Sequence, residues 1–447
     1  MDLDAALRQR AAGASGADSP PRRVDAATES SGNDSELEMD DVVSLGERAD
    51  RVVHQLRVAF GTALASPVAW VQLRPSIAAL REHKLRQVER GTATIRAVQR
   101  LRSPAMDALM QAASFMCEED FYLVALPLGF WAGDYRLARR VTVLVVTGLF
   151  VGNVIKDVYQ LPRPTNVWRP GLNLDSTGLA DFGFPSTHAM NAVTNSLYLV
   201  WYHRDALRAA GPARLEAAAA ASLAYVALVC ASRLYLGAHT PTDVRGGLGL
   251  GAIVLAVFCG GAMERIEAAA AAAPPEAVAL AWAPLAVALL LLNPQPRPPT
   301  PSFLQNALVV GLAWGLLAGA SFADAEGLSG PNPPLSRWTA AKVAGGFAAV
   351  ALVRVAVKGL ATLLVTRALG IRVKPEVRVL TRRNRENPSR KARVVRLLTR
   401  DVDMIGVAVI KTLTYASIAF AITYGVPALA RDVGPTVGAE LARLVGV

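Results

Sequence analysis

Residues 141–155 read VTVLVVTGLFVGNVI, and this stretch decides the class of fold. The run contains no charged residue, and an uncharged apolar run of this kind indicates a helix inside a bundle or across a membrane. Further apolar runs lie at about 115–132, 188–202, 215–231, 246–262, 278–292, 303–322, 339–364 and 404–429. The sequence therefore predicts an all-α fold, a polytopic integral membrane bundle of eight or nine spans.

The composition excludes the other broad classes of protein. Hydrophobic residues make up 52% of the 447 positions and charged residues only 19%, too little charge for a soluble surface and too apolar for a disordered chain. The formal net charge is +11. Beside apolar spans, such a surplus favours loops that face anionic lipid over nucleic-acid binding. The three cysteines form neither a disulfide framework nor a zinc spacing.

The chain is expected to divide into six parts. Residues 1–50 are acidic and polar and read as a disordered tail. Amphipathic or interfacial helices are expected over 51–112, including a short apolar run at 58–73. The remaining parts are the core spans with the polar motifs at 113–263, additional spans at 264–366, a basic loop at 367–402, and a last span with its tail at 403–447.

The first polar segment, KDVYQLPRP at 156–164, follows the run at 141–155 directly. It places Lys156 and Arg163 seven positions apart, with Pro162 and Pro164 stiffening the backbone around the arginine. Two rigidly placed cations suit a dianionic group. In isolation, cations at a helix end are equally typical of a membrane interface.

The second segment, FPSTHAMN at 184–191, opens the next apolar run. Pro185, Ser186 and Thr187 are residues typical of a helix N-terminus, where free N–H groups and the helix dipole favour an anion. A hydroxyl and the imidazole of His188 beside that position indicate phosphate binding with proton transfer. The alternative is a serine cap next to a structural histidine.

The third segment, SRLYLGAHTPTD at 232–243, joins two further runs and contains Arg233. Asp243 follows His239 by four positions, so a helical turn would bring the carboxylate to the imidazole and fix its tautomer. An oriented histidine is what nucleophilic attack requires. A satisfied His–Asp pair at the interface is the alternative.

Topology brings the three segments together. With one crossing per span, all three lie at the same membrane face, which predicts a phosphoryl site made of three cations, a helix N-terminus and two histidines. No metal cluster, phosphate-binding glycine loop or cysteine nucleophile is evident in the sequence. We therefore expect no metal and no cofactor.

These residues resemble the signature of the type 2 phosphatidic acid phosphatase superfamily. Its three parts are a lysine followed after six residues by Arg-Pro, then Pro-Ser-x-His, then Ser-Arg with histidine and aspartate downstream, and all three are present here without a gap. The form Pro-Ser-Thr-His-Ala-Met-Asn is similar to the sphingosine-1-phosphate (long-chain-base phosphate) phosphatase branch. Glu119 to Tyr122 and Leu413 to Tyr415 are similar to that branch as well.

The resemblance implies a role for each site residue. His239 would attack phosphorus and form a phosphohistidine, Asp243 would orient it, and His188 would protonate the leaving alkoxide and then activate water. The residues implied in holding the phosphate are Lys156, Arg163, Ser186, Thr187 and Arg233.

The resemblance also implies a substrate and a location. It implies hydrolysis of sphingoid long-chain-base 1-phosphates at the lumenal face of the endoplasmic reticulum membrane. Phosphatidate or lysophosphatidate is the alternative within the same chemistry, and a phosphate or lipid transporter is the alternative from another class.

The distribution of cations gives two opposed indications of sidedness. The loops away from the site carry Arg136, Arg139, Arg140, Arg204, Arg208 and Arg214, which the positive-inside rule places in the cytosol. Residues 372–400, however, hold eleven basic and two acidic residues and, with nine spans, fall on the site's own side. Either a late span is miscounted or the rule is weak this far along the chain. This loop is a solvated arm or a binder of anionic lipid headgroups.

Overall fold

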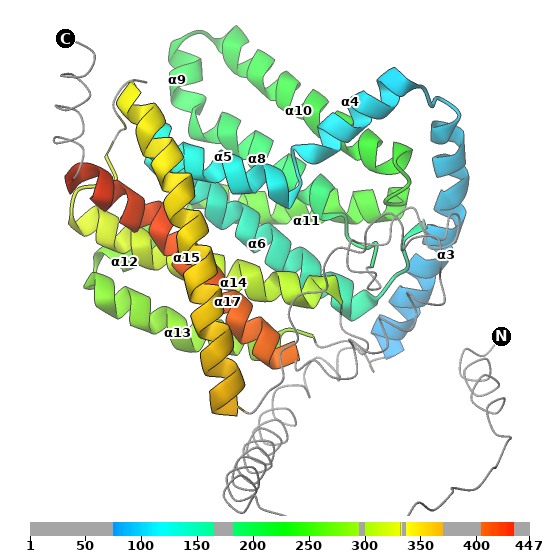
Figure 1. Ribbon diagram of the computed structural model, residues 1–447. Helices are drawn as coiled ribbons and strands as arrows, with labels where there is room; N and C mark the ends of the chain where they lie inside the picture. The colour runs from blue at the N-terminus through cyan, green and yellow to red at the C-terminus, as the bar shows by residue number, and fades with distance from the viewer. Residues whose placement is uncertain are drawn as a thin grey trace, which may run out of the picture. The chain divides into compact units, whose positions relative to one another are not determined.

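The computed structural model describes residues 75–164, 182–294, 300–330, 332, 337–369 and 404–432 (Figure 1). All of them belong to one compact unit, Arg48–Val447. Within these ranges every regular element is a helix, and the one β-bridge there is an isolated pair between Pro162 and Phe182. The predicted all-α fold is confirmed.

Several expectations concern residues outside the described ranges. The acidic tail at 1–50, the apolar run at 58–73, nearly all of the basic loop at 367–402 and the tail after 432 all lie there. The division into six parts therefore stays a prediction.

The helices follow one another through the described ranges without a sheet between them. In chain order they are α3 (Pro75–Gln99), α4 (Pro104–Phe115), α5 (Glu119–Ala132), α6 (Tyr135–Tyr159), α8 (Thr187–Tyr202), α9 (Arg204–Ala209), α10 (Pro212–Tyr235), α11 (Pro241–Val257), the π-helical η1 (Phe258–Ala262), α12 (Met263–Ala271), α13 (Pro275–Leu292), α14 (Pro301–Ala325), α15 (Arg337–Leu369), α17 (Met404–Phe420) and the π-helical η3 (Ala421–Gly425).

Seven helices of the described residues are long and apolar enough to cross a membrane. They are Tyr135–Tyr159, Pro212–Tyr235, Pro241–Ala271, Pro275–Leu292, Pro301–Ala325, Thr339–Arg367 and Gly406–Asp432. Two of the nine predicted runs instead form the shorter helices α5, with 14 residues, and α8, with 16. A helix rises 1.5 Å per residue, so neither covers a hydrocarbon layer of about 30 Å.

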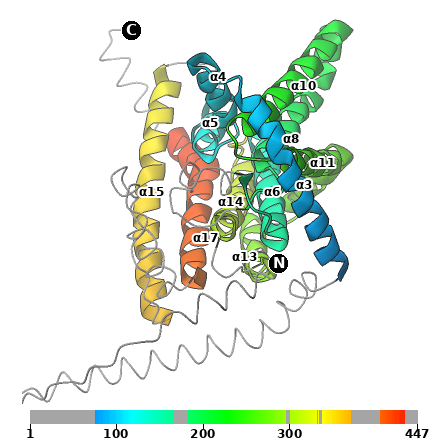
Figure 2. The same cartoon turned by 90° about the vertical axis from the view of Figure 1, so that its right-hand side faces the viewer.

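The helices pack in a row around α6 and α14. In the turned view of Figure 2, α15 and α17 lie on one side of these two helices, and α8, α11 and α10 lie on the other. The contacts agree, because α15 packs on α17, α17 on α14, α14 on α6, and α6 on α8. The buried core includes Trp131, Leu144, Met190 and Leu316, which come from four different helices.

Polar contacts at both ends of α6 give the direction of its neighbours. Near the end of α6, Thr300 Oγ1 donates to Asp157 Oδ1 at 2.8 Å; near its start, Arg139 Nη1 donates to Asp324 Oδ2 at 2.6 Å. Since Thr300 precedes α14 and Asp324 ends it, α14 runs antiparallel to α6. We call the two ends of the bundle the Lys156 end and the Arg139 end.

The two late helices have opposite directions. Tyr135 Oη donates to the carbonyl of Thr423 at 2.9 Å, so α17 finishes at the Arg139 end. The end of α15 packs on the first half of α17, where Ala361 and Val365 contact Ile410. The last described residues before 370 and the first after 403 therefore both lie at the Lys156 end.

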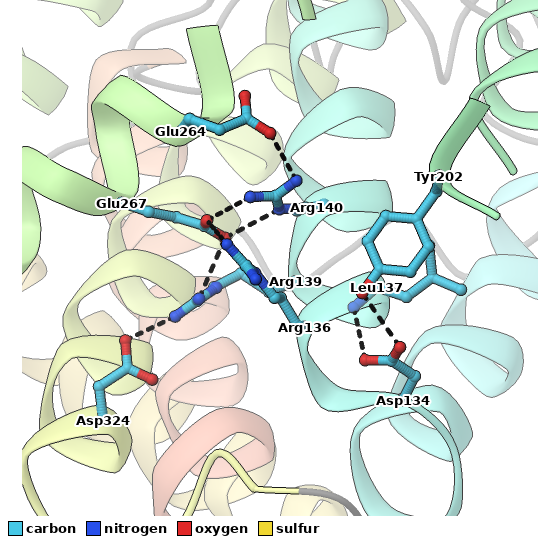
Figure 3. A network of polar contacts seen from close by, with 9 residues as sticks. All are labelled: Asp134, Arg136, Leu137, Arg139, Arg140, Tyr202, Glu264, Glu267 and Asp324. Atoms are coloured by element: carbon cyan, nitrogen blue, oxygen red, sulfur yellow. Dashed lines mark hydrogen bonds and ion pairs between the residues drawn. The ribbon is translucent and has the colours of Figure 1, made fainter. Parts of the chain in front are cut away.

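An arginine cluster holds the Arg139 end together (Figure 3). Glu267 of α12 accepts from Arg136, Arg139 and Arg140, all in the first two turns of α6. Arg140 also contacts Glu264 at 2.7 Å. These arginines were counted above as loop cations that indicate the cytosol, but they are neutralised by acidic residues within the bundle.

Candidate functional site

The first segment starts inside α6 and then turns back over the site. Lys156 lies in the last turn of this helix and is buried, with 4% of its surface exposed. Gln160 adopts a left-handed conformation (φ 49°) that ends the helix. Gly183 N–H then donates to the carbonyl of Leu161 at 2.8 Å. This hydrogen bond holds the backbone around Arg163 beside the second segment.

The second segment forms the N-terminus of α8 at the Lys156 end. Ser186 caps the helix, because its Oγ accepts from Ala189 N–H at 3.4 Å. Its own N–H donates to the carbonyl of Asp243 at 3.0 Å. Ser186 is fully buried and Thr187 is 7% exposed. The second segment is therefore tied through its backbone to the third.

The third segment makes a tight turn between α10 and α11. The carbonyl of Arg233 accepts from Ala238 N–H at 3.0 Å and from His239 N–H at 3.2 Å. Thr240 and Asp243 then form a capping box, in which Asp243 Oδ2 accepts from Thr240 N–H at 2.7 Å. The same Oδ2 lies 3.7 Å from His239 Nδ1, and both side chains are buried. The expected helical turn brings carboxylate and imidazole together.

Three cations surround His239. Arg163 Nη1 donates to the carbonyl of Ala238 at 3.4 Å, one residue before the histidine. Burial, and then the charges of Arg163, Arg233 and Lys156, hold the pKa of His239 well below its usual range. The lowered pKa favours the neutral imidazole, whose Nδ1 lies 3.7 Å from Asp243 Oδ2 and forms no hydrogen bond among the described residues.

Two residues missed by the sequence reasoning orient Arg233. Its Nη1 donates to Ser114 Oγ of α4, and Ser114 Oγ donates to Glu118 Oε1 at 3.0 Å. Arg233 and Ser114 lie 119 positions apart in the chain, so no local pattern could pair them. The sequence feature that could have indicated this contact is the acidic run Glu118 to Asp120 at the start of an apolar helix.

His188 lines a cavity of about 320 Å³. It lies in the first turn of α8, and its Nε2 has no hydrogen-bond partner among the described residues. The cavity is also lined by Thr187, Cys117, Glu118, Glu119, Asp120, Tyr122, Leu149 and Gln305. An imidazole that opens into a cavity beside a cationic anion site can exchange a proton with a bound molecule.

All eight predicted site residues lie at the Lys156 end of the bundle, on α6, α8, α10, α11 and the turns between them. Within the described ranges, no group of three histidine, cysteine, aspartate or glutamate side chains could hold a metal ion. The arrangement combines three cations, a helix N-terminus, one imidazole with a carboxylate 3.7 Å from its Nδ1 and a second imidazole, and this combination suits a phosphate monoester. The role of each residue stays a proposal.

Comparisons with known proteins give the class. Residues 137–266 match the PAP2 superfamily. The lipid phosphate phosphatase delta of Arabidopsis thaliana is 30% identical over 302 residues, which cover 65% of this chain and 72% of that protein. Sphingosine-1-phosphate phosphatase 2 of Mus musculus is 36% identical over 149 residues, 33% of this chain and 40% of that protein. A dihydrosphingosine 1-phosphate phosphatase of Schizosaccharomyces pombe is 32% identical over 183 residues, 40% of this chain and 44% of that protein.

The fold and the matches define a multi-pass membrane protein of a phosphatase superfamily. The chain belongs to the PAP2 superfamily, as the resemblance of its motifs implied, and its relatives include sphingosine-1-phosphate phosphatases and a lipid phosphate phosphatase. The matches to the two sphingoid phosphatases span less than half of either relative.

Proposed function

We propose that this protein hydrolyses sphingoid long-chain-base 1-phosphates to the free base and phosphate, without a metal and through a phosphohistidine. The observation that carries the proposal is His239, a buried neutral imidazole with Asp243 on one edge at 3.7 Å and three cations around it. Phosphate binding alone requires the cations but no oriented nucleophile.

In the first step, His239 Nε2 attacks phosphorus and the bond from phosphorus to the lipid oxygen breaks. His188 donates its proton to the leaving alkoxide; a bound dianionic phosphate favours the protonated form of this histidine beforehand. In the second step, a water attacks phosphorus and gives a proton to His188. The P–N bond then breaks and inorganic phosphate leaves.

The negative charge that develops in both steps is stabilised by the protein. Lys156, Arg163 and Arg233 supply positive charge to the equatorial oxygens, and the N-terminus of α8 at Ser186 and Thr187 supplies backbone N–H groups. The positive charge that a divalent metal provides in other phosphoryl-transfer enzymes is here provided by side chains.

The sphingoid substrate is supported by the printed names of two relatives and by the motif form at Ser186 to Asn191. The relative that covers most of this chain is named a lipid phosphate phosphatase, which supports phosphatidate as the second candidate. We also propose the endoplasmic reticulum membrane as the location, with a lumenal site, on the same resemblance.

The test is phosphate release by the full chain in detergent with a chelator present. Sphingosine 1-phosphate and phosphatidate are offered to the wild type, to His239→Ala and to His203→Ala, whose histidine is exposed at the Arg139 end. We expect His239→Ala to lose turnover and His203→Ala to keep it. His188→Gln should also lose turnover, because the leaving alkoxide lacks its acid and the water lacks its base. Wild type quenched during turnover should carry acid-labile phosphate that His239→Ala does not carry.

Each contrary outcome removes a different part of the proposal. Turnover that survives in His239→Ala would contradict the phosphohistidine intermediate. A requirement for magnesium would contradict a metal-independent reaction. A preference for phosphatidate would make phosphatidate, and not the sphingoid phosphate, the substrate. Binding of phosphate without release from any lipid would favour the transporter.

A further inference from the structure

A second cavity adjoins the cavity at His188. It lies between α5, α6, α14 and α17, and most of its lining is apolar, including Leu126, Leu312 and Ile418. The two cavities share four lining residues, Glu119, Tyr122, Leu149 and Gln305. A molecule with a polar head at His188 can therefore extend into the apolar cavity.

The helices around the apolar cavity come from two parts of the chain. The match to the PAP2 superfamily covers 137–266, whereas α5, α14 and α17 lie outside that range. Of the four helices only α6 belongs to the matched part. The candidate phosphate site thus lies on residues of the matched part, whereas three of the four helices around the apolar cavity lie outside it.

Glu119 is held at the junction of the two cavities. It accepts from Gln305 Nε2, and Gln305 Oε1 in turn accepts from Asn153 Nδ2 at 2.6 Å. Asn153 also donates to Asn306 Oδ1 at 3.1 Å, so the chain of amides is anchored in the buried interface between α6 and α14. An oriented carboxylate at this position is a ready partner for a cation.

The polar cavity is lined by groups of different chemistry. Thr187, which is 7% exposed, lies in its lining beside His188, whose Nε2 has no hydrogen-bond partner among the described residues. Buried polar groups are normally hydrogen-bonded, so a buried nitrogen left in this way indicates a ligand. The carboxylates of Glu118, Glu119 and Asp120 line the same cavity.

We propose that one single-chain lipid phosphate with an ammonium group next to its phosphate fills both cavities. The phosphate lies at His188 and Thr187, the ammonium faces Glu119, and the alkyl chain enters the apolar cavity. This inference rests on the proposed function and adds the residues that select the substrate. Glu119 is exposed within the cavity, so a lipid head that displaces its water without offering an amine removes the solvation of the carboxylate and replaces it with nothing.

The first test compares two single-chain substrates, sphingosine 1-phosphate with its amine and lysophosphatidate without one. Glu119→Gln keeps the hydrogen bond to Gln305 in shape and removes the charge. We expect kcat/KM for sphingosine 1-phosphate to fall about 10-fold or more, with less than about a 2-fold change for lysophosphatidate. Glu216→Gln, an exposed acid on α10, is the matched control. An equal loss on both substrates would overturn the ammonium site.

The second test uses two leucines of α5. Leu126 lines the apolar cavity, whereas Leu128 is 36% exposed and does not. Leu126→Trp should lower turnover of long-chain substrates about 10-fold or more and spare a short-chain alkyl phosphate, since overfilling a packed space displaces what occupies it. Leu128→Trp should leave both unchanged. Equal behaviour of the two variants, with short-chain turnover intact, would overturn the chain site.

Failure of the proposed function has a different signature. If the wild type releases phosphate from none of these lipids, the function fails before selectivity is measured. Should Leu126→Trp lose short-chain turnover as well, Leu312→Trp on α14 gives the same comparison from the opposite wall of the cavity.

Discussion

One oxygen of Asp243 serves two purposes. Oδ2 accepts from the N–H of Thr240 at 2.7 Å and lies 3.7 Å from Nδ1 of His239. The capping box fixes the carboxylate through the start of α11, so its position does not depend on the histidine. The carboxylate that we propose orients the nucleophile is thus itself held by a feature of helix formation.

Asp243→Asn separates these two purposes. The amide oxygen can still accept from Thr240, so thermal unfolding should stay near that of the wild type. The negative charge that stabilises the imidazole during attack is lost, and we expect kcat to fall by about 10³-fold or more, as for other histidines deprived of their carboxylate. Turnover and unfolding are measured on the same preparation. Asp243→Ala should lose both, and wild-type turnover in Asp243→Asn would contradict the orienting role.

The cations around His239 should determine the pH below which activity is lost. His239 must be neutral to attack. Burial and three positive charges lower its pKa, so the imidazole stays neutral at a lower pH than an ordinary histidine does. Arg163→Gln removes one of these charges and should raise the pKa. Activity should then be lost at a higher pH as the solution is acidified.

The measurement is the acidic limb of kcat/KM against pH. The substrate's own ionisation is common to both enzymes, so a difference between them belongs to the protein. Arg208→Gln, at an exposed position of α9, is the control and should keep the wild-type limb. A limb that stays in place in Arg163→Gln, with only the plateau lowered, would contradict the electrostatic argument.

The placement of the eight candidate residues at one end of the bundle was predictable because their spacing is local. Each motif spans at most twelve positions, and helix ends convert such spacing into geometry. Ser114 and Gln305 were not predictable in this way, because they reach the site from other helices through a side chain. Long-range partners depend on how helices pack, which a single sequence does not specify.

At the scale of elements, α14 and α17 form the most extensive helix pair of the described residues. Three glycines of α14 face α17 and its continuation η3. A Cβ on Gly311 would collide with the backbone of Thr412 and one on Gly315 with that of Ala416, both in α17, and a Cβ on Gly319 would collide with the side chain of Thr423 in η3. Small residues at every fourth position let two helices approach closely.

Gly315→Leu should therefore displace α17. We expect the free energy of unfolding to drop by about 2 kcal/mol or more, in the range found when well-packed contacts are overfilled. Thermal unfolding in detergent measures it. Gly345→Leu on α15, where a Cβ meets nothing within 4 Å, is the matched control. Equal stability of the two variants would contradict the close α14–α17 contact.

The same scale explains why two predicted spans are short. The predicted run at 188–202 was itself short, and α8 covers all of it from the Ser186 cap at the site to Tyr202. The run at 115–132 is shortened at its start. α5 begins at Glu119, directly after the acidic side chain that holds Ser114. Apolar periodicity predicts that a helix exists, whereas polar residues of the site decide where it starts.

At the scale of the whole molecule, the two ends of the bundle differ in how their charged side chains are arranged. At the Arg139 end, the arginines of α6 are paired with carboxylates from α12 and α14 (Figure 3). At the Lys156 end, cations are gathered around His239. The net charge of +11 therefore says little about either end, and the paired arginines give weaker support for a cytosolic Arg139 end than unpaired ones.

The directions of α15 and α17 lead to the last prediction, which concerns sidedness. Residues 369 and 404 both lie at the Lys156 end, so the chain between them begins and ends on the same side of the membrane as the site. Glu386→Thr creates a glycosylation acceptor at Asn384 in that stretch. A flexible insert with an acceptor after Gly211, where the space is open, reports on the Arg139 end.

With a lumenal site, cells should glycosylate Glu386→Thr and leave the Gly211 insert unmodified; a mobility shift that an endoglycosidase reverses measures both. The reverse pattern would place His239 and the basic residues of 372–400 in the cytosol, as the positive-inside rule favours for that stretch, and would refute the proposed location while leaving the chemistry intact. Glycosylation of both variants would contradict the helix directions themselves, because α10 ends at the site and begins at the opposite end.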